Sequence, residues 1–422
     1  MSVDERMRIG LRQAYDALDS DVEAALVHVE SGVRRQRTRQ TLLLATAAAV
    51  VAVAGVVWGP GALGWLAGQD EVQPAEVPRD ADGGWVRVEG TGLDLAPSGL
   101  SAVTELDGRL IAVGGFAQAG EAILASTDGV VWTPADTPDA RHGLWLHDVS
   151  RGGPGLIAYG ADAYGSVVWT SPDGLTWTAA DPIAPSGFIR TIEVGGPGFL
   201  ALGDVDEAGP AGLWTSVDGL AWQSVTPESF GGPDEPFVAD IIDTGSGMVA
   251  VGSVNHEQVG ERAAVWTSVD GVSWSRLPDD PAVFGADPGI GMDHVVAGGP
   301  GLVAVGSHWL DGSVVWTSVD GQTWTRVPEQ QHGLDGWVYR LFGMGGELVA
   351  VGGRPDGPAA IWTSPDGYAW EAVTDESFDG PDEPLITDVI ETSTGLIAVG
   401  TTDADFGADG PSTAAVWVRE QP

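Results

Sequence analysis

The sequence predicts an all-β protein, a seven-bladed β-propeller of four-stranded blades that is closed by an N-terminal strand and preceded by a single transmembrane helix and a short cytoplasmic helical segment. A tryptophan, an Asp-Gly turn and a second aromatic residue recur six times in the same order. The turn aspartates lie 45, 45, 52, 50 and 46 residues apart, at Asp128, Asp173, Asp218, Asp270, Asp320 and Asp366. A period of 40 to 50 residues is typical of propeller blades.

Each repeat divides into four segments that are short and β-rich enough to be strands. The first alternates in polarity, as in residues 189–194. The second is small, apolar and ends in glycine; it occurs seven times, at residues 110–114, 156–160, 199–203, 248–252, 302–306, 348–352 and 396–400. The third ends in Trp-Thr-Ser, and the Asp-Gly turn leads to a fourth that begins at the second Trp. Seven second strands therefore accompany only six complete outer hairpins.

The missing outer strand is supplied from the other end of the domain. Residues 415–418 form a seventh third strand, after which the sequence has no further Asp-Gly turn. Residues 85–88 match the fourth-strand pattern seen at residues 324–327. Because an open ring leaves two unpaired edges, we expect residues 84–90 to complete the last blade together with residues 374–420.

The region before the propeller divides into three segments. Residues 41–66 lack charged side chains and are long enough to span a bilayer as a helix. Arginines precede this segment and acids follow it, so the positive-inside rule places residues 1–40 in the cytoplasm and residues 84–422 outside the membrane. Residues 67–83 form an acidic linker. A cleaved signal peptide is the alternative to an anchor.

Residues 1–40 carry an amphipathic helical pattern that could bind a cytoplasmic protein partner or lie on the inner leaflet. Their layout resembles the N-terminal segments of bacterial anti-sigma-type membrane proteins, without the zinc-binding His and Cys pattern.

Composition limits the partners of the propeller. The formal net charge is -41, all 19 basic residues are arginine, and cysteine is absent. Nucleic acid and anionic membrane surfaces would be repelled, whereas a cationic partner would be attracted. Thiolate metal sites and disulfides are excluded.

The turns of the type Ser171-Pro172-Asp173-Gly174 resemble the Asp-box (BNR) repeats of sialidase-like β-propellers, in a form shortened by one residue between Asp and Gly. The resemblance covers residues 84–420. It implies that the six turn aspartates are structural, because these boxes lie away from the active site in that family.

The same resemblance raises the alternative of a sialidase-like glycoside hydrolase. Such catalysis needs an arginine triad, a nucleophilic tyrosine paired with a glutamate, and an aspartic acid. The Phe-Arg-Ile-Pro segment of the family is missing, and Phe188-Ile189-Arg190 does not replace it. We expect Tyr159 in a buried strand and Tyr368 in an outer hairpin to stay away from the channel mouth. No catalytic residue is therefore assigned, and an enzyme is not the favoured interpretation.

Candidate ligand-binding residues form one column in the innermost strands. Counting back eight residues from each second strand gives Ala102, Asp148, Thr191, Asp240, His294, Arg340 and Asp388. We expect Asp148, Asp240, His294, Arg340 and Asp388 to ring the channel mouth, either to contact a ligand or to bond blade to blade. No second histidine in register supports a metal site.

Long acidic loops should share the face of this mouth. They include residues 204–207, 255–261, 279–287, 403–409 and the duplicated segments 228–236 and 376–384. Their carboxylates could bind Ca²⁺, although no known calcium-loop spacing is present and a solvated surface is favoured. No other cofactor is expected.

These observations favour a membrane-anchored extracytoplasmic propeller that binds or scaffolds a protein or glycan ligand on its acidic-loop face. The alternatives are the sialidase-like hydrolase and a transmembrane sensor in which residues 1–40 pass ligand binding to a cytoplasmic regulator.

Overall fold

The computed structural model describes residues 84–420, except 97–98, 116–122, 139–143, 154, 163, 184–186, 196–197, 206–210, 257–259, 286–288, 309–311, 355–358, 379–383 and 403–412. The predictions for residues 1–40, 41–66 and 67–83 lie outside this part of the chain. No helix among the described residues is long and apolar enough to cross a membrane.

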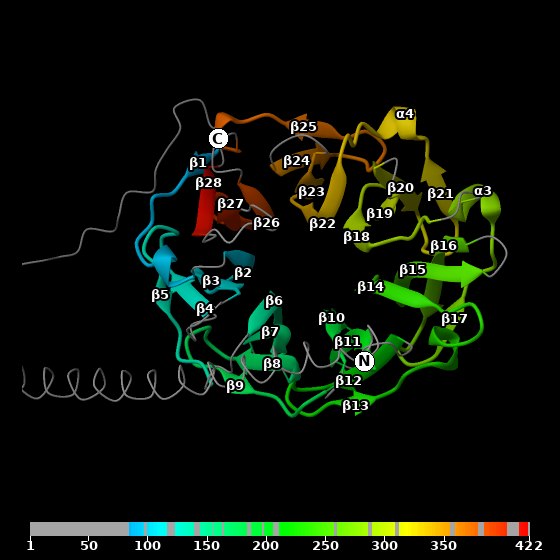
Figure 1. Cartoon of the computed structure of the whole chain (residues 1–422), viewed down its shortest axis with the longest axis horizontal. Helices are drawn as coiled ribbons and strands as arrows, with labels where there is room; N and C mark the ends of the chain where they lie inside the picture. Colours follow the sequence, from blue (N-terminus) through cyan, green and yellow to red (C-terminus); the bar gives the residue numbers. More distant parts are fainter. Residues whose placement is uncertain are drawn as a thin grey trace, which may run out of the picture. The chain divides into compact units, whose positions relative to one another are not determined.

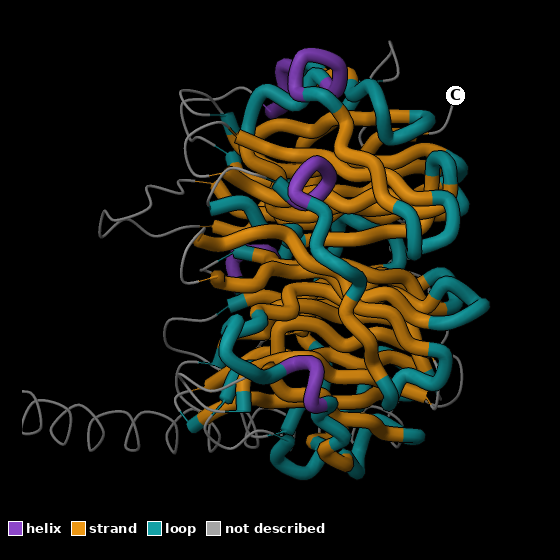
Figure 2. Tube along the Cα trace, turned by 90° about the vertical axis from the view of Figure 1, so that its right-hand side faces the viewer, coloured by secondary structure: helices purple, strands orange, loops and turns teal. Residues whose placement is uncertain are grey.

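The described residues form seven four-stranded antiparallel sheets arranged around a central axis (Figure 1), which confirms the predicted seven-bladed propeller. In each sheet the strands follow one another from the axis outward, and they extend across the thickness of the ring between two sets of loops (Figure 2).

The blades are numbered in chain order from the first inner strand. Blade 1 contains β2 (Leu100–Leu106), β3 (Arg109–Gly114), β4 (Ile123–Ser126) and β5 (Thr133–Pro134). Blade 2 contains β6 (Trp145–Gly152), β7 (Gly155–Asp162), β8 (Gly165–Ser171) and β9 (Thr178–Ala179). Blade 3 contains β10 (Ile189–Gly195), β11 (Gly198–Asp204), β12 (Ala211–Ser216) and β13 (Gln223–Ser224). Blade 4 contains β14 (Phe237–Asp243), β15 (Met248–His256), β16 (Gly260–Ser268) and β17 (Trp274–Arg276).

The remaining blades follow the same order. Blade 5 contains β18 (His294–Gly298), β19 (Gly301–His308), β20 (Gly312–Ser318) and β21 (Trp324–Val327). Blade 6 contains β22 (Trp337–Met344), β23 (Glu347–Gly353), β24 (Ala359–Ser364) and β25 (Glu371–Val373). Blade 7 contains β26 (Leu385–Thr392), β27 (Gly395–Thr402), β28 (Thr413–Glu420) and, as its outer strand, β1 (Val86–Arg87).

Strand β1 closes the ring as predicted. It pairs antiparallel with β28, Val86 opposite Val418, and the backbone N–H of Val88 donates to the carbonyl of Val416 at 2.9 Å. The first and last described strands therefore share one sheet, and the outer edge of β28 is paired rather than open.

A β-bulge interrupts most of the innermost strands. The pairing register shifts between Leu146 and Asp148 in β6, and equivalent shifts occur in β2, β10, β14, β22 and β26. Because a bulge places two residues opposite one, two consecutive side chains face the axis, and the buried residues on either side are three apart instead of two.

A glycine near the end of each second strand lies directly against the backbone that leads into the inner strand. A Cβ at Gly160 would collide with the backbone oxygen of Trp145 at the start of the inner strand. The same collision would occur at all seven positions, which are Gly114, Gly160, Gly203, Gly252, Gly306, Gly352 and Gly400. Only glycine allows the two backbones to approach this closely.

The core lies between neighbouring blades. One cluster joins Leu200 and Leu202 of blade 3 to Met248 and Ala250 of blade 4, and the next joins blade 4 to blade 5 in the same way. The third-strand tryptophans are among the largest fully buried side chains, namely Trp266, Trp316, Trp362 and Trp417. Stacking the blades therefore buries the apolar faces that no single sheet could bury alone.

The six Ser-x-Asp-Gly turns share one hydrogen-bond pattern. In the first, Asp128 Oδ1 accepts the backbone N–H groups of Val130 and Val131, and the N–H of Gly129 donates to Ser126 Oγ at 2.9 Å. Gly129 has a φ of 74°, in the left-handed region that glycine adopts readily. In five of the six turns the second Trp donates its indole N–H to the glycine carbonyl.

Short helices in the blade-to-blade connections fill the outer rim. They are η1 (Leu93–Leu95), η2 (Glu228–Phe230), α3 (Pro281–Phe284), α4 (Glu329–His332) and η3 (Glu376–Phe378). The buried Phe230 ring packs on Trp266 and Trp274, with ring centroids 6.0 and 5.6 Å apart. Trp266 donates its indole N–H to the carbonyl of Ser229. The duplicated Glu-Ser-Phe segments thus place a phenylalanine against the tryptophans of the blade beside them.

Candidate functional site

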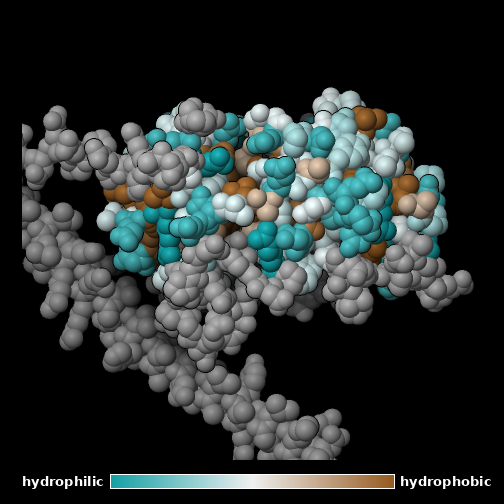
Figure 3. All heavy atoms as spheres, turned by 90° about the horizontal axis from the view of Figure 1, so that it is seen from above, coloured by the Kyte–Doolittle hydropathy of each residue, from teal (hydrophilic) through white to brown (hydrophobic). Residues whose placement is uncertain are grey.

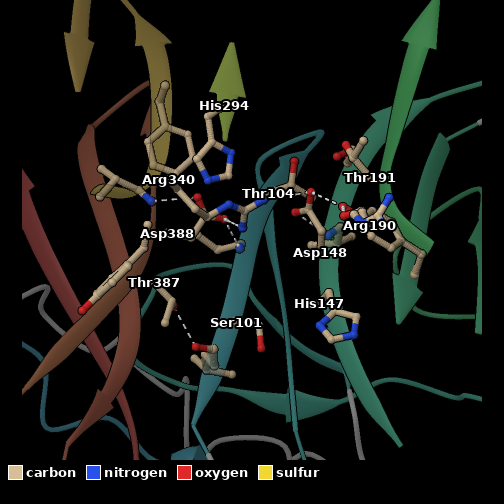
Figure 4. Close-up of a pocket in the computed structure, with 18 of the residues that line it drawn as sticks. Ser101, Thr104, His147, Asp148, Arg190, Thr191, His294, Arg340, Thr387 and Asp388 are labelled. Carbon is tan, nitrogen blue, oxygen red and sulfur yellow. Dashed lines mark hydrogen bonds and ion pairs between the residues drawn. The ribbon is translucent and has the colours of Figure 1, made fainter. Parts of the chain in front are cut away.

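A cavity of 1380 Å³ lies at the propeller axis and is lined by innermost strands. Figure 4 shows side chains from several blades converging on it. Because each inner strand begins at the end of a blade-to-blade loop, the first residues of these strands form the mouth on the long-loop face.

The bulges bring two rings of side chains to this cavity. Of the predicted column, Asp148, Thr191, Asp240, His294, Arg340 and Asp388 line it. Ala102 is buried and does not line it. The residue immediately before the column position was not predicted at the channel, but in six blades it also lines the cavity. These residues are Ser101, His147, Arg190, Ala239, Tyr339 and Thr387. The three-residue spacing between apolar positions, as in Leu146 and Val149, was the available sign of this second ring.

Arg340 joins two of the predicted aspartates. Its Nη2 lies 2.9 Å from Asp148 Oδ2, and its Nη1 lies 3.9 Å from Asp388 Oδ2. Burial alone would lower the pKa of Arg340, but Asp148 and Asp388 raise it, so the guanidinium stays charged. Burial raises the pKa of Asp388 to about 7 despite the opposing effect of Arg340. The three side chains form the polar floor of the mouth.

Two of the predicted aspartates bond blade to blade, which was the alternative interpretation of the column. Asp388 Oδ2 accepts the backbone N–H of Val103 in blade 1 at 2.8 Å. Asp240 Oδ2 accepts the N–H of Val295 in blade 5 at 3.0 Å. Each also accepts the N–H of the residue that follows it through Oδ1. These carboxylates therefore accept backbone N–H groups of the neighbouring blade as well as of their own strand.

The last pair of predicted residues, His294 and Asp240, lies within the electrostatic influence of Arg340. His294 Nδ1 is 3.9 Å from Asp240 Oδ2. Burial raises the pKa of Asp240 to about 6, and burial together with Arg340 lowers the pKa of His294. Near neutral pH the histidine is therefore neutral, and the contact is a weak polar one.

Tyr159 reaches the cavity, contrary to the sequence expectation. Its ring is buried in β7 as predicted, but its hydroxyl lies 3.4 Å from Asp148 Oδ2 and donates to the carbonyl of Arg190 at 3.1 Å. Burial and the charge of Asp148 raise its pKa well above the usual range, so the phenol remains protonated. The expectation failed because the second strand approaches the bulged inner strand closely enough for a long side chain to pass beside it.

Aromatic side chains line part of the mouth. Trp145 and Phe188 line the cavity. Trp145, Phe188 and Phe237 lie at or directly before the first residue of the inner strands of blades 2, 3 and 4, and they are 45, 51 and 44% exposed. Arg190 stacks over the Phe237 ring, with its Cζ 4.2 Å from the centroid, and forms an ion pair with Asp204. We call Trp145, Phe188 and Phe237 the aromatic crescent.

His147 lies beside the aromatic crescent. Its ring centroid is 6.3 Å from that of Phe188, and its Nε2 is buried without a hydrogen-bond partner among the described residues. Burial lowers its pKa, so the ring is neutral near pH 7 and offers one donor and one acceptor.

The acidic loops are only partly described. Asp234 in the first duplicated segment forms an ion pair with Arg276, with Nη2 and Oδ2 3.0 Å apart. Within the described ranges no three His, Asp or Glu side chains are placed to hold a metal ion. Residues 206–207, 257–259, 286–287, 379–383 and 403–409 lie outside the described part, so Ca²⁺ binding by these loops stays a prediction.

The Ser-x-Asp-Gly turns lie on the face that carries the first-to-second strand turns, as predicted. Arg109, at the start of β3, donates to the carbonyl of Asp173 in the turn of the next blade at 3.0 Å.

Hydrophilic residues cover much of the described surface in the view of Figure 3, with smaller hydrophobic areas between them.

Comparisons with known proteins find propellers at low identity. No protein-family model and no curated protein matches the chain. Matching solved structures include the β-propeller domain of the Trilobed protease from Pyrococcus furiosus (13% identity, TM-score 0.45, 75% of this chain and 97% of that chain). Trypanosoma rangeli sialidase in complex with sialic acid also matches, with 13% identity and a TM-score of 0.40 over 76% of this chain and 54% of that chain. The fucose-specific lectin from Aleuria aurantia matches with 10% identity and a TM-score of 0.39 over 65% of this chain and 93% of that chain. The Asp-box resemblance of the turns stays a prediction.

Proposed function

We propose that this propeller is a recognition module that binds a glycan or protein ligand at the channel mouth on its long-loop face. The observation that carries the proposal is a cavity of 1380 Å³ whose rim exposes aromatic rings while the charged groups of its floor are paired with one another. A concave site with aromatic walls and a few fixed polar groups is the usual form of a ligand site. The same arrangement leaves little free chemistry for catalysis.

Sialidase-type hydrolysis is disfavoured by the state of the candidate groups. Arg340 is held by Asp148 and Asp388, and Arg190 by Asp204, so neither is free to bind a substrate carboxylate. Tyr159 keeps its proton because its pKa is raised, which removes it as a nucleophile.

A direct test is ligand binding by the full-length chain before and after the cavity is filled. Ser101 lines the cavity from blade 1, and Ser101→Trp would place an indole inside it. We expect ligands captured from glycan and secreted-protein panels to lose at least tenfold in affinity for this variant. Thr127→Trp is the matched control, because residue 127 is exposed in a turn on the opposite face. Unchanged binding to Ser101→Trp would exclude the channel as the site.

The hydrolase remains the second candidate because Asp388, with a pKa of about 7, lies beside the cavity with Asp148 and Arg340. A carboxyl group that is half protonated near neutral pH could serve as a general acid. Turnover of a fluorogenic sialoside by the full-length chain, abolished by Arg340→Ala under conditions in which circular dichroism shows that variant to be folded, would establish it. We expect no turnover above the rate with heat-denatured chain.

We also propose that residues 41–66 anchor the propeller outside the cell membrane, with residues 1–40 in the cytoplasm. The apolar composition of residues 41–66 and the arginines before them support this topology. Protease added to intact cells should digest the propeller and spare an epitope at the N-terminus.

In the sensor alternative, ligand binding changes the interaction of residues 1–40 with a cytoplasmic regulator. A specific partner captured by the full-length chain, and released when ligand is added, would support it. Identical capture with and without ligand would count against it.

A further inference from the structure

The aromatic residues at the mouth are distributed unevenly around the ring. The position three residues before the predicted column is aromatic and exposed in three consecutive blades, at Trp145, Phe188 and Phe237. The equivalent residues of the other blades are Gly99, Gly291, Trp337 and Leu385. In all seven blades the backbone oxygen of this residue lies against the glycine of the second strand, which shows that the positions are equivalent. The exposed aromatic residues at this position therefore lie in three neighbouring blades, and Trp145 and Phe188 among them line the cavity.

A nitrogen of His147 without a hydrogen-bond partner among the described residues lies next to the aromatic crescent. The Nε2 of His147 is buried and unpartnered among the described residues, and the centroid of its ring lies 6.3 Å from that of Phe188. A buried polar atom without a partner costs free energy, about 1 to 3 kcal/mol for a neutral group. A ligand hydroxyl reaching His147 would remove that cost.

The charges around the aromatic crescent favour an uncharged ligand. Arg190, the cation on this wall, is occupied by Asp204 and by the carbonyl of Val238, to which its Nη1 donates at 3.1 Å. An acidic ligand would also approach the carboxylates of Asp148 and Asp388 in the floor and the -41 net charge of the chain. An ammonium group would meet Arg340 at the centre of the floor.

We propose, as an extension of the proposed function, that the aromatic crescent binds an uncharged sugar ring, one without carboxylate, sulfate or phosphate groups. The C–H face of the ring stacks on Trp145 and Phe188, and its hydroxyls hydrogen-bond to His147 and to carboxylate oxygens of the floor. Aromatic rings suit this role because they offer a flat apolar face with little conformational entropy to lose. A cavity of 1380 Å³ has room for more than one sugar unit.

The test uses an array of uncharged gluco-, manno-, galacto- and xylo-oligosaccharides, each matched with sialylated, uronic-acid and sulfated forms. The full-length chain is applied in a polyoxyethylene detergent, because sugar-based detergents would compete for the site. Calorimetry then measures the affinity for the strongest array ligand. We expect that ligand to be uncharged and the matched acidic forms to bind at least tenfold more weakly.

Variants assign the binding to the aromatic crescent. Trp145→Ala and Phe188→Ala should each weaken binding at least tenfold, and His147→Phe, which keeps the ring but removes its nitrogens, at least threefold. Tyr368→Ala is the matched control, since Tyr368 is 43% exposed in a turn on the opposite face, and it should bind within twofold of the parent chain. Near-UV circular dichroism and the thermal midpoint check that each variant is folded.

The outcomes separate this inference from the function on which it rests. Binding of an acidic glycan that Ser101→Trp abolishes but Trp145→Ala leaves unchanged would overturn the crescent subsite and keep the channel site. Binding of a protein ligand at the channel, with no glycan bound, would do the same. Ligand binding that neither variant changes would overturn both.

Discussion

Arg340 and Asp148 form an ion pair across the propeller channel. They belong to blades 6 and 2, which are separated by blades 7 and 1 on the shorter path around the ring, yet Nη2 and Oδ2 lie 2.9 Å apart. Asp388 of blade 7 lies 3.9 Å from the same guanidinium, and its carboxylate accepts the backbone N–H of Val103 in blade 1. One cation therefore connects four blades beneath the mouth.

Removing this cation should destabilise the fold. Arg340→Ala would leave Asp148 and Asp388 facing each other without a counter-charge, and breaking a buried ion pair from one side costs about 3 to 5 kcal/mol. We expect a lower thermal midpoint and a lower midpoint in urea. Arg109→Ala removes an arginine whose hydrogen bond to the Asp173 carbonyl is exposed, and it should change the free energy of unfolding by less than about 0.5 kcal/mol.

A double-mutant cycle should detect the coupling itself. If the two side chains interact as described, Asp148→Asn will cost less in the Arg340→Ala background than in the parent chain. A coupling energy of about 1 to 3 kcal/mol is expected for such neighbours. Additive effects of the two substitutions would mean that the ion pair does not form in solution.

The buried carboxyls predict that stability falls as the pH rises through neutrality. Burial raises the pKa of Asp388 and Glu193 to about 7 and that of Asp240 to about 6, above the unfolded values near 4. Between pH 4 and 7 the folded chain therefore binds more protons than the unfolded chain. Each group then lowers the free energy of unfolding by up to about 1.4 kcal/mol per pH unit. We expect a higher thermal midpoint at pH 5 than at pH 8.

Four of the turn aspartates, Asp173, Asp218, Asp270 and Asp320, have lowered pKa values and act in the opposite direction at lower pH. Backbone N–H groups of Ser273 and Val272 lower the pKa of Asp270 to about 2, so its contribution is lost as the pH falls from about 4 towards 2. Thermal midpoints measured from pH 3 to 9 should therefore pass through a maximum near pH 4 to 5. Asp388→Asn, which cannot titrate, should flatten the decline between pH 5 and 8. An unchanged slope in that variant would contradict the assignment to Asp388.

The repeat pattern was sufficient to predict the blades and their closure. Blade period, strand order and the pairing of residues 85–88 with residues 415–418 all follow from matching apolar and turn residues, because each blade must bury the same faces against its neighbours. The column of Asp148, Asp240, His294, Arg340 and Asp388 lines the cavity, since position along a strand fixes depth in the ring, while ligand binding by these residues stays a prediction.

The partners within the site could not be predicted in the same way. The column gives one residue position in each of the seven blades, but it does not tell which side chains are long enough to cross the axis. The contact between Arg340 and Asp148 was therefore not anticipated. The second ring, including His147 and Arg190, was missed because strict alternation assigns those residues to the other side of the strand. The bulge reverses that assignment, and its signs in the sequence were the three-residue spacing of apolar positions such as Leu146 and Val149 and the glycine near the end of every second strand.

That glycine predicts a severe and specific substitution effect. In Gly352→Ala the new Cβ would collide with the backbone oxygen of Trp337, which cannot rotate away, so we expect a loss of about 3 kcal/mol in the free energy of unfolding. Gly231→Ala is the matched control. Its Cβ would find only the Glu228 oxygen at 3.8 Å, and its φ of -130° is accessible to alanine. Chemical denaturation should therefore separate the two variants clearly, and equal stabilities would mean that the bulge is absent.

Closure of the ring can be tested with a disulfide, because the chain has no cysteine of its own. Val86 and Val418 are paired across β1 and β28, and paired antiparallel residues have Cα atoms about 4.5 to 5.5 Å apart, within the range that a disulfide spans. The Val86→Cys and Val418→Cys double variant should oxidise without free thiols and without intermolecular dimers. Linking strands so far apart in sequence should raise stability by about 4 kcal/mol, reversibly on reduction. Each single variant controls for the substitution, and thiols that stay titratable in the folded double variant would show that β1 does not complete blade 7.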